Sequence, residues 1–268
     1  MTDLTNELSF ASYLARRAGA AAMEHYGKVS AAIKEGGSPV TEADHAANRV
    51  IVEGLRRSFP RDAILSEESA DTQERLTARR VWIVDPLDGT KEFLSQNGEF
   101  AVMIGLAVRG EPVLGVVYLP DPDVLYRAAS GAGAWVERGG EVRRLERASI
   151  AGATPRMVGS RSHSEPLLEE IREALGVTEV VPCGSVGVKC SRIADGVLDL
   201  YVHPVRYLKE WDTCAPEVVA REAGCSVSDC IGEPLRYNKG EPVQPDGILV
   251  QAPGCDPAVL DTVRSLVG

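Results

Sequence analysis

The 268-residue chain has neither a long hydrophobic run nor an N-terminus that resembles a leader. No window approaches 18 consecutive apolar residues, so stable membrane insertion is not expected. The first ten residues, MTDLTNELSF, lack the basic, apolar and small-residue regions of a signal peptide. A cytoplasmic location is therefore expected, and a hydrophobic content of 44% is ample for a packed core.

The chain also lacks the cysteine patterns of metal fingers and redox motifs. Its six cysteines form no CxxC pair, so buried free thiols are expected. Positive charge is scarce as well, since 29 basic and 39 acidic residues give a net charge of −10. This balance disfavours a nucleic-acid polymer as partner. A small anionic ligand is compatible with it if metal ions supply positive charge locally.

The first half of the chain carries two helical patterns followed by strand patterns. Residues 7–26 have apolar side chains at helical spacing, and Thr41 is expected to cap a second helix that ends before Pro60. Short strands are expected at 63–65 and 81–84. Beyond residue 93, successive strands separated by Gly and Pro turns predict an antiparallel meander in a sheet of five or more strands.

The second half, past about residue 150, alternates strands and helices, which is typical of an α/β unit. We therefore predict an α/β protein built from an N-terminal α+β half, residues 1–150, and a C-terminal α/β half, residues 151–268. The functional site is expected in the cleft between the two halves.

Acidic residues follow several of the expected strands and helix starts. Glu67 follows the strand at 63–65, Asp85 and Asp88 follow the strand at 81–84, and Asp212 lies in the second half. Two-metal phosphoryl chemistry needs carboxylates that converge from different elements, because Mg²⁺ prefers oxygen ligands. These four acids are therefore candidate metal ligands.

The segment DPLDGT, residues 85–90, is expected to form a tight turn. Pro86 fixes one backbone angle and Gly89 permits the turn, so the Asp88 carboxylate can approach that of Asp85. A divalent cation would offset their repulsion, and the Leu87 carbonyl can also face it. The same turn opens a helix whose first N–H groups, from Gly89 onward, can bind an anion.

Four segments of the chain together resemble a known family: Asp44, Ser66-Glu67-Glu68, residues 85–90 and residues 211–215. Their order and spacing are similar to those of the lithium-sensitive, magnesium-dependent phosphatase superfamily that includes inositol monophosphatase. The resemblance spans most of the chain and implies a layered α-β-α-β-α sandwich. It also implies two to three Mg²⁺ ions per site and lithium inhibition.

The resemblance implies roles for individual residues. Glu67, Asp85 and the Leu87 carbonyl look like the ligands of the first metal. Asp85, Asp88 and Asp212 look like the ligands of the second metal, and Glu67 would also touch a third ion. Thr90 and Asp44 look like the pair that polarises the attacking water.

Smaller segments resemble one branch of this superfamily, the 3′(2′),5′-bisphosphate nucleotidases. Lys91-Glu92 stands where inositol phosphatases usually carry Thr-Asn, and His203 lies near the position of their inositol-binding Glu. The implied reaction is hydrolysis of the 3′-phosphate of adenosine 3′,5′-bisphosphate, with 3′-phosphoadenylyl sulfate as a further substrate. The expected substrate contacts are Asp88, Gly89, Thr90, Lys91, Arg161, His163, Ser185, Lys189 and Asp212.

The same residues also admit other interpretations. An inositol or sugar phosphatase would use the same metals with a different pocket, and a silent nucleotide-sensing protein would keep the fold without turnover. On the simplest interpretation Asp85 and Asp88 form an ordinary solvated turn, and Arg161 and Lys189 are surface charges. Many relatives are homodimers, but the apolar pattern identifies no interface.

Overall fold

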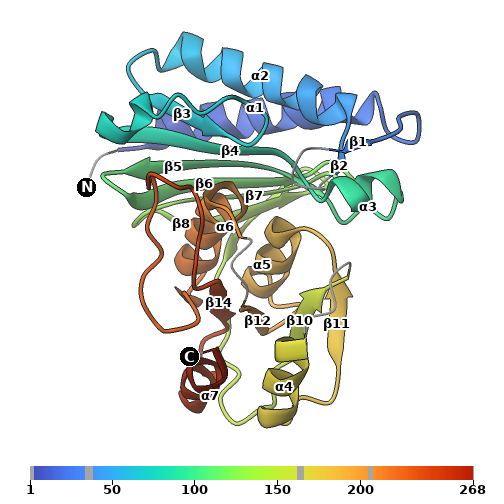
Figure 1. Cartoon of the computed structure of the whole chain (residues 1–268), viewed down its shortest axis with the longest axis vertical. Coiled ribbons are helices and arrows are strands. Elements are labelled where there is room, and N and C mark those ends of the chain that lie inside the picture. The colour runs from blue at the N-terminus through green and yellow to red at the C-terminus, as the bar shows by residue number, and fades with distance from the viewer. Residues whose placement is uncertain (1–2, 34–38, 162–165, 205–207, 268) are drawn as a thin grey trace.

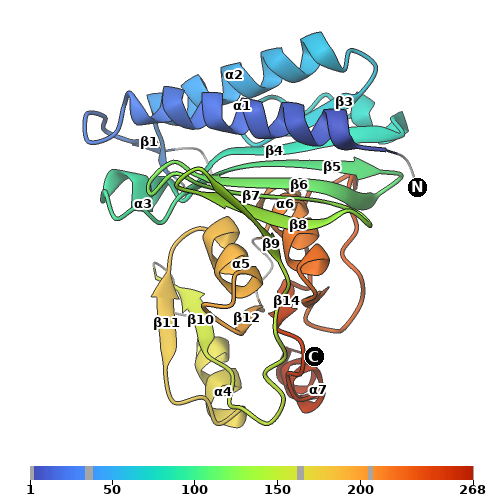
Figure 2. The ribbon, with the colours of Figure 1, turned by 180° about the vertical axis from the view of Figure 1, so that it is seen from behind.

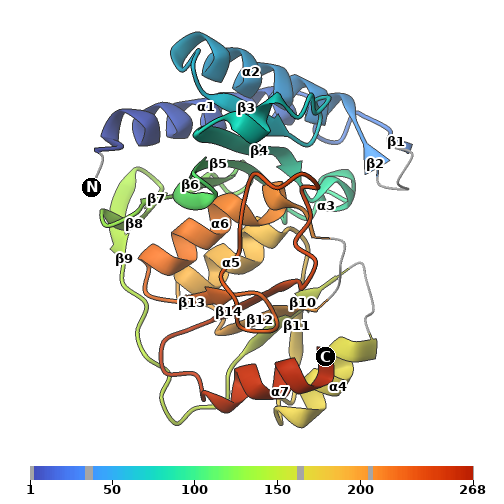
Figure 3. The same ribbon diagram turned by 60° about the vertical axis from the view of Figure 1, so that its left-hand side comes forward.

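The computed structural model of the protein describes residues 3–33, 39–161, 166–204 and 208–267, which form five stacked layers. Helices α1 (Thr5–Met23) and α2 (Glu42–Ser58) cover the outer face of a seven-stranded sheet (Figure 1). Helices α5 (Val186–Ala194) and α6 (Glu210–Glu222) lie between this sheet and a five-stranded one. Helices α4 (Pro166–Ala174) and α7 (Ala258–Val267) form the last layer (Figure 3). The expected α-β-α-β-α sandwich is confirmed.

The larger sheet contains the predicted meander. Its strands, in spatial and sequence order, are β3 (Ala63–Ser66), β4 (Arg80–Asp88), β5 (Ala101–Val108), β6 (Glu111–Leu119), β7 (Val124–Ala129), β8 (Gly133–Arg138) and β9 (Glu141–Leu145). Only the β3–β4 pair is parallel, and every later pair is antiparallel. Both faces are covered, because Trp82 and Val84 of β4 enter the core under α1 and α2 while Val81 and Ile83 enter the core on the opposite face.

Helix α6 lies unusually close to this sheet, which fixes the position of Asp212 in its first turn. Gly105 and Gly115 pair across β5 and β6. A Cβ atom at Gly105 would lie 2.5 Å from Cys214 Sγ, and one at Gly115 would lie 2.1 Å from the Ala215 carbonyl oxygen. The absence of side chains at these two positions therefore permits the helix to pack against the strands.

The smaller sheet has a mixed topology. Its strands, in spatial order, are β11 (Val180–Cys183), β10 (Met157–Ser160), β12 (Leu200–His203), β14 (Ile248–Gln251) and β13 (Ser226–Ser228). The pairs that β10 makes with β11 and β12 are parallel, and the pairs of β14 are antiparallel. Figure 2 shows the segment after β9 leading from the larger sheet to this one.

The shorter elements are the hairpin of β1 (Ala32–Ile33) and β2 (Pro39–Val40), the 3-10 helix η1 (Glu74–Thr77) and the helix α3 (Thr90–Leu94). Thr41 caps α2 as predicted, because its hydroxyl accepts the Ala43 N–H. No helix in the described ranges combines the length and hydrophobicity that a membrane crossing requires.

Candidate active site

The strand β4 ends in the turn that carries the first two acids. Its pairing with β5 shifts between Asp85 and Asp88, so the chain leaves the regular sheet there. Asp85 is buried, and its Oδ1 accepts the Leu87 N–H at 2.9 Å. Gly89 has a φ of 99°, and a Cβ there would lie 2.9 Å from the Glu99 carbonyl oxygen. The turn therefore requires glycine at this position.

Three carboxylates converge at this turn. Asp85, Asp88 and Asp212 each offer an oxygen atom, and these atoms all lie within 4.8 Å of one another. Burial raises the pKa of Asp85 well above 3.8, and the negative charges of Glu67, Asp88 and Asp212 raise it further. Burial and the charges of Asp88 and Glu67 likewise raise the pKa of Asp212 well above 3.8. Asp85 is only 2% exposed, which argues against an ordinary solvated turn.

This cluster has the properties of a divalent cation site. Carboxylate oxygens are the ligands that Mg²⁺ prefers, and a bound cation would relieve the repulsion that raises these pKa values. Glu67 follows β3 and lines the same cavity, as does Leu87. The donors therefore suit the predicted metal ions.

Asp44 and Thr90 lie in direct contact, and Thr90 lines the same cavity as the three carboxylates. The Thr90 hydroxyl donates to Asp44 Oδ1 at 3.0 Å. The other Asp44 oxygen, Oδ2, accepts the Thr41 N–H and hydroxyl at 2.8 and 2.7 Å, in the capping box of α2. The helix start thus holds the buried Asp44 carboxylate in one orientation toward Thr90.

The C-terminal half contributes the opposite wall. Ser185 caps α5, and its hydroxyl donates to Asp88 Oδ2 at 2.5 Å, while the Gly187 N–H donates to the same oxygen at 2.8 Å. Lys189 is only 4% exposed, so it is not a surface charge. Its ammonium group lies 5.2 Å from the centre of the Tyr201 ring and donates to the carbonyls of Cys183 and Gly184.

Most of the predicted site residues line one cavity of ≈ 270 Å³. Glu67, Asp85, Leu87, Asp88, Gly89, Thr90, Lys91, Ser185, Lys189 and Asp212 line it. Arg161 is not among the lining residues. Its guanidinium pairs with Glu99, and its side chain is 42% exposed. His163 lies outside the described residues.

Two residues of β12 that were not predicted as site residues, Tyr201 and His203, also line the cavity. His203, near the position of the inositol-binding Glu of inositol phosphatases, is half-buried in the cavity wall. Tyr201 is buried, and within the described chain its hydroxyl has no hydrogen-bond partner. An unsatisfied buried hydroxyl in a cavity wall is suited to contact a ligand. Tyr201 and His203 are two residues apart in the strand segment LDLYVHP, and side chains at this spacing lie on the same face of a strand. This spacing is the sequence signal that could have placed both on one face.

The fold and the acidic site define a member of a known phosphatase family. Residues 3–263 match the model of the inositol monophosphatase family, and the chain belongs to this family. Members are metal-dependent, in agreement with the acidic cluster. The resemblance inferred from the four segments is therefore confirmed.

Within this family, the chain is similar to proteins that are named as phosphatases of nucleotides. It is 42% identical over 235 residues to the 3′(2′),5′-bisphosphate nucleotidase CysQ of Escherichia coli (strain K12), covering 85% of this chain and 92% of that protein. It is 36% identical over 229 residues to the 3′-phosphoadenosine 5′-phosphate phosphatase of Mycobacterium leprae, covering 83% and 81%.

Solved structures show the same fold. The crystal structure of CysQ from Bacteroides thetaiotaomicron has a TM-score of 0.81 and 32% identity, covering 95% of this chain and all of that one. An inositol monophosphatase from Anabaena has a TM-score of 0.79 and 27% identity, covering 99% and 97%.

Proposed function

We propose that this chain is a 3′(2′),5′-bisphosphate nucleotidase that hydrolyses the 3′-phosphate of adenosine 3′,5′-bisphosphate. The observation that carries the proposal is the convergence of Asp85, Asp88 and Asp212 beside the Thr90–Asp44 pair, in a chain similar to bisphosphate nucleotidases over most of its length. Hydrolysis of 3′-phosphoadenylyl sulfate by the same site is part of the proposal.

The proposed metal ligands are those that the family resemblance implies, and the donors in the cavity support them. Glu67, Asp85 and the Leu87 carbonyl would hold one Mg²⁺, and Asp85, Asp88 and Asp212 would hold a second, with Glu67 at a third ion. When bound, such ions lower the pKa of coordinated water and neutralise phosphate charge. The four carboxylates alone would repel a dianionic phosphate, and cations bound between them would allow it to approach.

Thr90 and Asp44 are proposed to orient the attacking water. With its hydroxyl proton donated to Asp44 Oδ1, Thr90 presents an oxygen lone pair that can accept a hydrogen bond from water. The water oxygen forms a bond to phosphorus, and its proton passes through the Thr90 hydroxyl to Asp44. The bond between phosphorus and the 3′ oxygen breaks, and that oxygen takes a proton from solvent. The products are AMP and inorganic phosphate.

The N–H groups of Gly89, Thr90 and Lys91 are proposed to contact the transferred phosphate, because these residues line the cavity at the turn that carries Asp88. Ser185, which was also expected to contact the substrate, lines the same cavity but donates its single hydroxyl proton to Asp88 Oδ2. We propose that it orients this carboxylate.

The second phosphate of the substrate is proposed to lie near the basic side chains. Lys91 is exposed at the cavity rim, and Lys189 has a third ammonium hydrogen beyond the two it gives to carbonyls. Arg161 and His163 complete the proposed set. Arg161 would contact an anion while still paired with Glu99.

Parallel assays test the proposal. The purified protein with Mg²⁺ is given adenosine 3′,5′-bisphosphate, inositol 1-phosphate and fructose 1,6-bisphosphate, and phosphate release is measured. We expect the highest kcat/KM on the nucleotide. A preference for either of the other esters by more than tenfold would contradict the assignment.

Three further expectations from the sequence and the family resemblance belong to the proposal. They are a homodimer, a cytoplasmic location and a division into residues 1–150 and 151–268. Light scattering on the eluted protein tests the dimer, and a monomer mass would contradict it. Fractionation of the cell tests the location. Limited proteolysis near residue 150 tests the division.

A further inference from the structure

Glu99 is a buried acid that links the two halves of the molecule next to the site. It lies between α3 and β5, and its side chain is 11% exposed. Its N–H donates to Asn97 Oδ1 at 2.9 Å, and its carbonyl oxygen abuts Gly89. The backbone of Glu99 is thus packed against the turn that carries Asp88.

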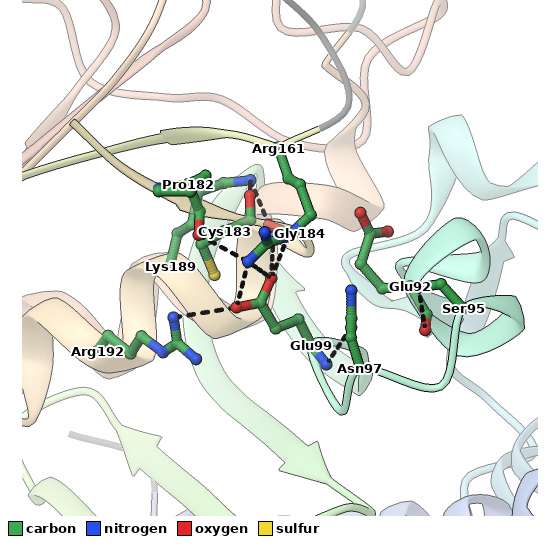
Figure 4. A network of polar contacts seen from close by, with 10 residues as sticks. All are labelled: Glu92, Ser95, Asn97, Glu99, Arg161, Pro182, Cys183, Gly184, Lys189 and Arg192. Atoms are coloured by element: carbon green, nitrogen blue, oxygen red, sulfur yellow. Dashed lines mark hydrogen bonds and ion pairs between the residues drawn. The ribbon is translucent and has the colours of Figure 1, made fainter.

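The Glu99 carboxylate receives donors from three separate segments of the C-terminal half, as Figure 4 shows. The Gly184 N–H donates to Oε2 at 2.8 Å. Arg161 donates to both oxygens at 2.9 to 3.0 Å, in a bidentate pair, and Arg192 reaches Oε1 at 3.4 Å. Such charge-assisted, bidentate contacts fix an orientation more firmly than neutral ones.

Gly184, which Glu99 holds, begins the turn that contacts the candidate metal ligand Asp88. Its neighbour Ser185 and then Gly187 donate to Asp88 Oδ2. The Gly184 carbonyl is held from the other side by Lys189. A Cβ on Gly184 would lie 2.2 Å from Glu92 Cγ, so the turn is also pressed against α3. The turn has little room to shift while these contacts persist.

We propose that Glu99 is a positioning residue that fixes the Asp88 carboxylate for metal binding through the Gly184–Ser185 turn. This inference rests on the proposed function in one respect, which is that Asp88 is a metal ligand. Without the Glu99 carboxylate, the Gly184 N–H loses its acceptor and the two guanidinium groups lose their shared counter-charge. The Ser185 hydroxyl then no longer holds Asp88 in one orientation, and metal affinity falls.

A second carboxylate at the other end of α5 provides a matched control. Asp195 follows α5 and also pairs with two arginines of the larger sheet, Arg138 at 2.7 Å and Arg143. Tyr126 donates to it at 3.2 Å. Asp195 therefore joins the same helix to the same sheet with the same chemistry, but its contacts with Arg138, Arg143 and Tyr126 do not lead to Asp88 or to the 183–185 turn.

The direct test is titration of the purified full chain with Mn²⁺ alone by calorimetry, since Mn²⁺ accepts the same oxygen ligands as Mg²⁺. For Glu99→Ala we expect a Kd raised about tenfold or more, the range found when outer partners of metal ligands are removed. Glu99→Gln keeps an oxygen for the Gly184 N–H and should show a smaller rise. Asp195→Asn should stay within twofold of the wild-type Kd.

Two results would overturn the proposal. One is a Glu99→Ala protein that binds Mn²⁺ within twofold of wild type. The other is an Asp195→Asn protein that loses as much affinity as Glu99→Ala, because the effect would then be general loosening of the two halves. If Glu99→Ala does not fold, the Kd values of Glu99→Gln and Asp195→Asn for Mn²⁺ are compared instead. A Glu99→Gln protein within twofold of wild type, or an equal loss in Asp195→Asn, would then overturn the proposal.

Turnover separates this proposal from the proposed function. In Glu99→Ala, excess Mg²⁺ should restore most of kcat on adenosine 3′,5′-bisphosphate, whereas a purely structural defect would not respond to metal. A wild-type protein without phosphatase activity would sink the proposed function, yet the Mn²⁺ titration would still decide the role of Glu99. An active wild type whose affinity for Mn²⁺ is unchanged in both Glu99 variants would sink only the present inference.

Discussion

The acidic and basic walls of the cavity differ in how their charges are compensated. On the acidic wall, Asp85 and Asp212 have pKa values raised by burial and by neighbouring carboxylates, so the protein supplies too little counter-charge. On the basic wall, which carries Lys91 and Lys189, Lys189 is bound by two carbonyls. Outside the lining of the cavity, Arg161 is bound by Glu99. The uncompensated negative charge of the carboxylates indicates that a cation binds there. Lys189 and Arg161 already have protein partners, so their charges do not indicate which substrate group they would contact. Substrate specificity is therefore harder to infer than metal binding.

The largest expected effect on kcat comes from removing a carboxylate of the acidic wall. Asp88→Asn removes one of the three converging carboxylates and should lower kcat by roughly 10³-fold, because a metal ligand provides several kcal/mol of transition-state stabilisation. Phosphate release at saturating Mg²⁺ measures it. Asp123→Asn, at a site that is 66% exposed, is the control and should retain full activity. An Asp88→Asn protein with more than a tenth of wild-type kcat would refute this role.

Next in size is the loss of the Thr90 hydroxyl. Thr90→Ala removes the group that is hydrogen-bonded to Asp44 and should reduce kcat by about 10²-fold or more, the usual contribution of a positioned proton-transfer group. Thr90→Ser keeps the hydroxyl and should stay within about tenfold of wild type. Equal activities of the two variants would show that the hydroxyl has no part in the reaction.

A smaller effect is expected on the basic wall. Lys91 is exposed at the cavity rim, so Lys91→Met should raise KM for adenosine 3′,5′-bisphosphate by about fivefold, in keeping with roughly 1 kcal/mol for a solvated ion pair. The KM for 3′-AMP, which lacks the second phosphate, should not change. The exposed Lys28→Met is the control. If both substrates are affected alike, Lys91 does not recognise the second phosphate.

The smallest effect concerns stability. The raised pKa values of Asp85 and Asp212 mean that the folded protein retains protons that the unfolded chain releases above about 3.8. These groups therefore contribute less stability as pH rises from 3.8 through their folded pKa values. Mg²⁺ binds the deprotonated form and offsets this loss, so the Mg²⁺-induced rise in Tm should be a few degrees at pH 7.5 and smaller at pH 5. Thermal unfolding with and without Mg²⁺ at both pH values measures it, and a larger rise at pH 5 would contradict the assignment.

The acidic wall could be predicted from the sequence because its residues are placed by local structure. Asp85 and Asp88 share one turn, Glu67 follows a strand, and Asp44 follows a recognisable N-cap. The meander and both N-terminal helices also follow from local patterns. The short strand β13 and the helix α7 were not predicted, although α7 has apolar residues at helical spacing.

The basic wall and the residues around it depend on contacts between distant segments, which local patterns do not contain. Arg161 and Glu99 are 62 positions apart, and no spacing rule pairs them. Tyr201 and His203 enter the cavity only because β12 lies beside β10 and β14 in the smaller sheet. The sequence therefore predicted which chemistry the site performs better than it predicted which groups contact the rest of the substrate.

The central claim is that Asp85, Asp88 and Asp212 hold the ions that act on a nucleotide phosphate. Crystals soaked with Mn²⁺, AMP and phosphate test it directly through anomalous scattering. We predict anomalous peaks bridged by these three carboxylates, with phosphate at the Gly89–Thr90 turn and the AMP phosphate toward Lys91 and Lys189. Peaks outside this cluster, or a cluster without metal at saturating Mn²⁺, would contradict the claim.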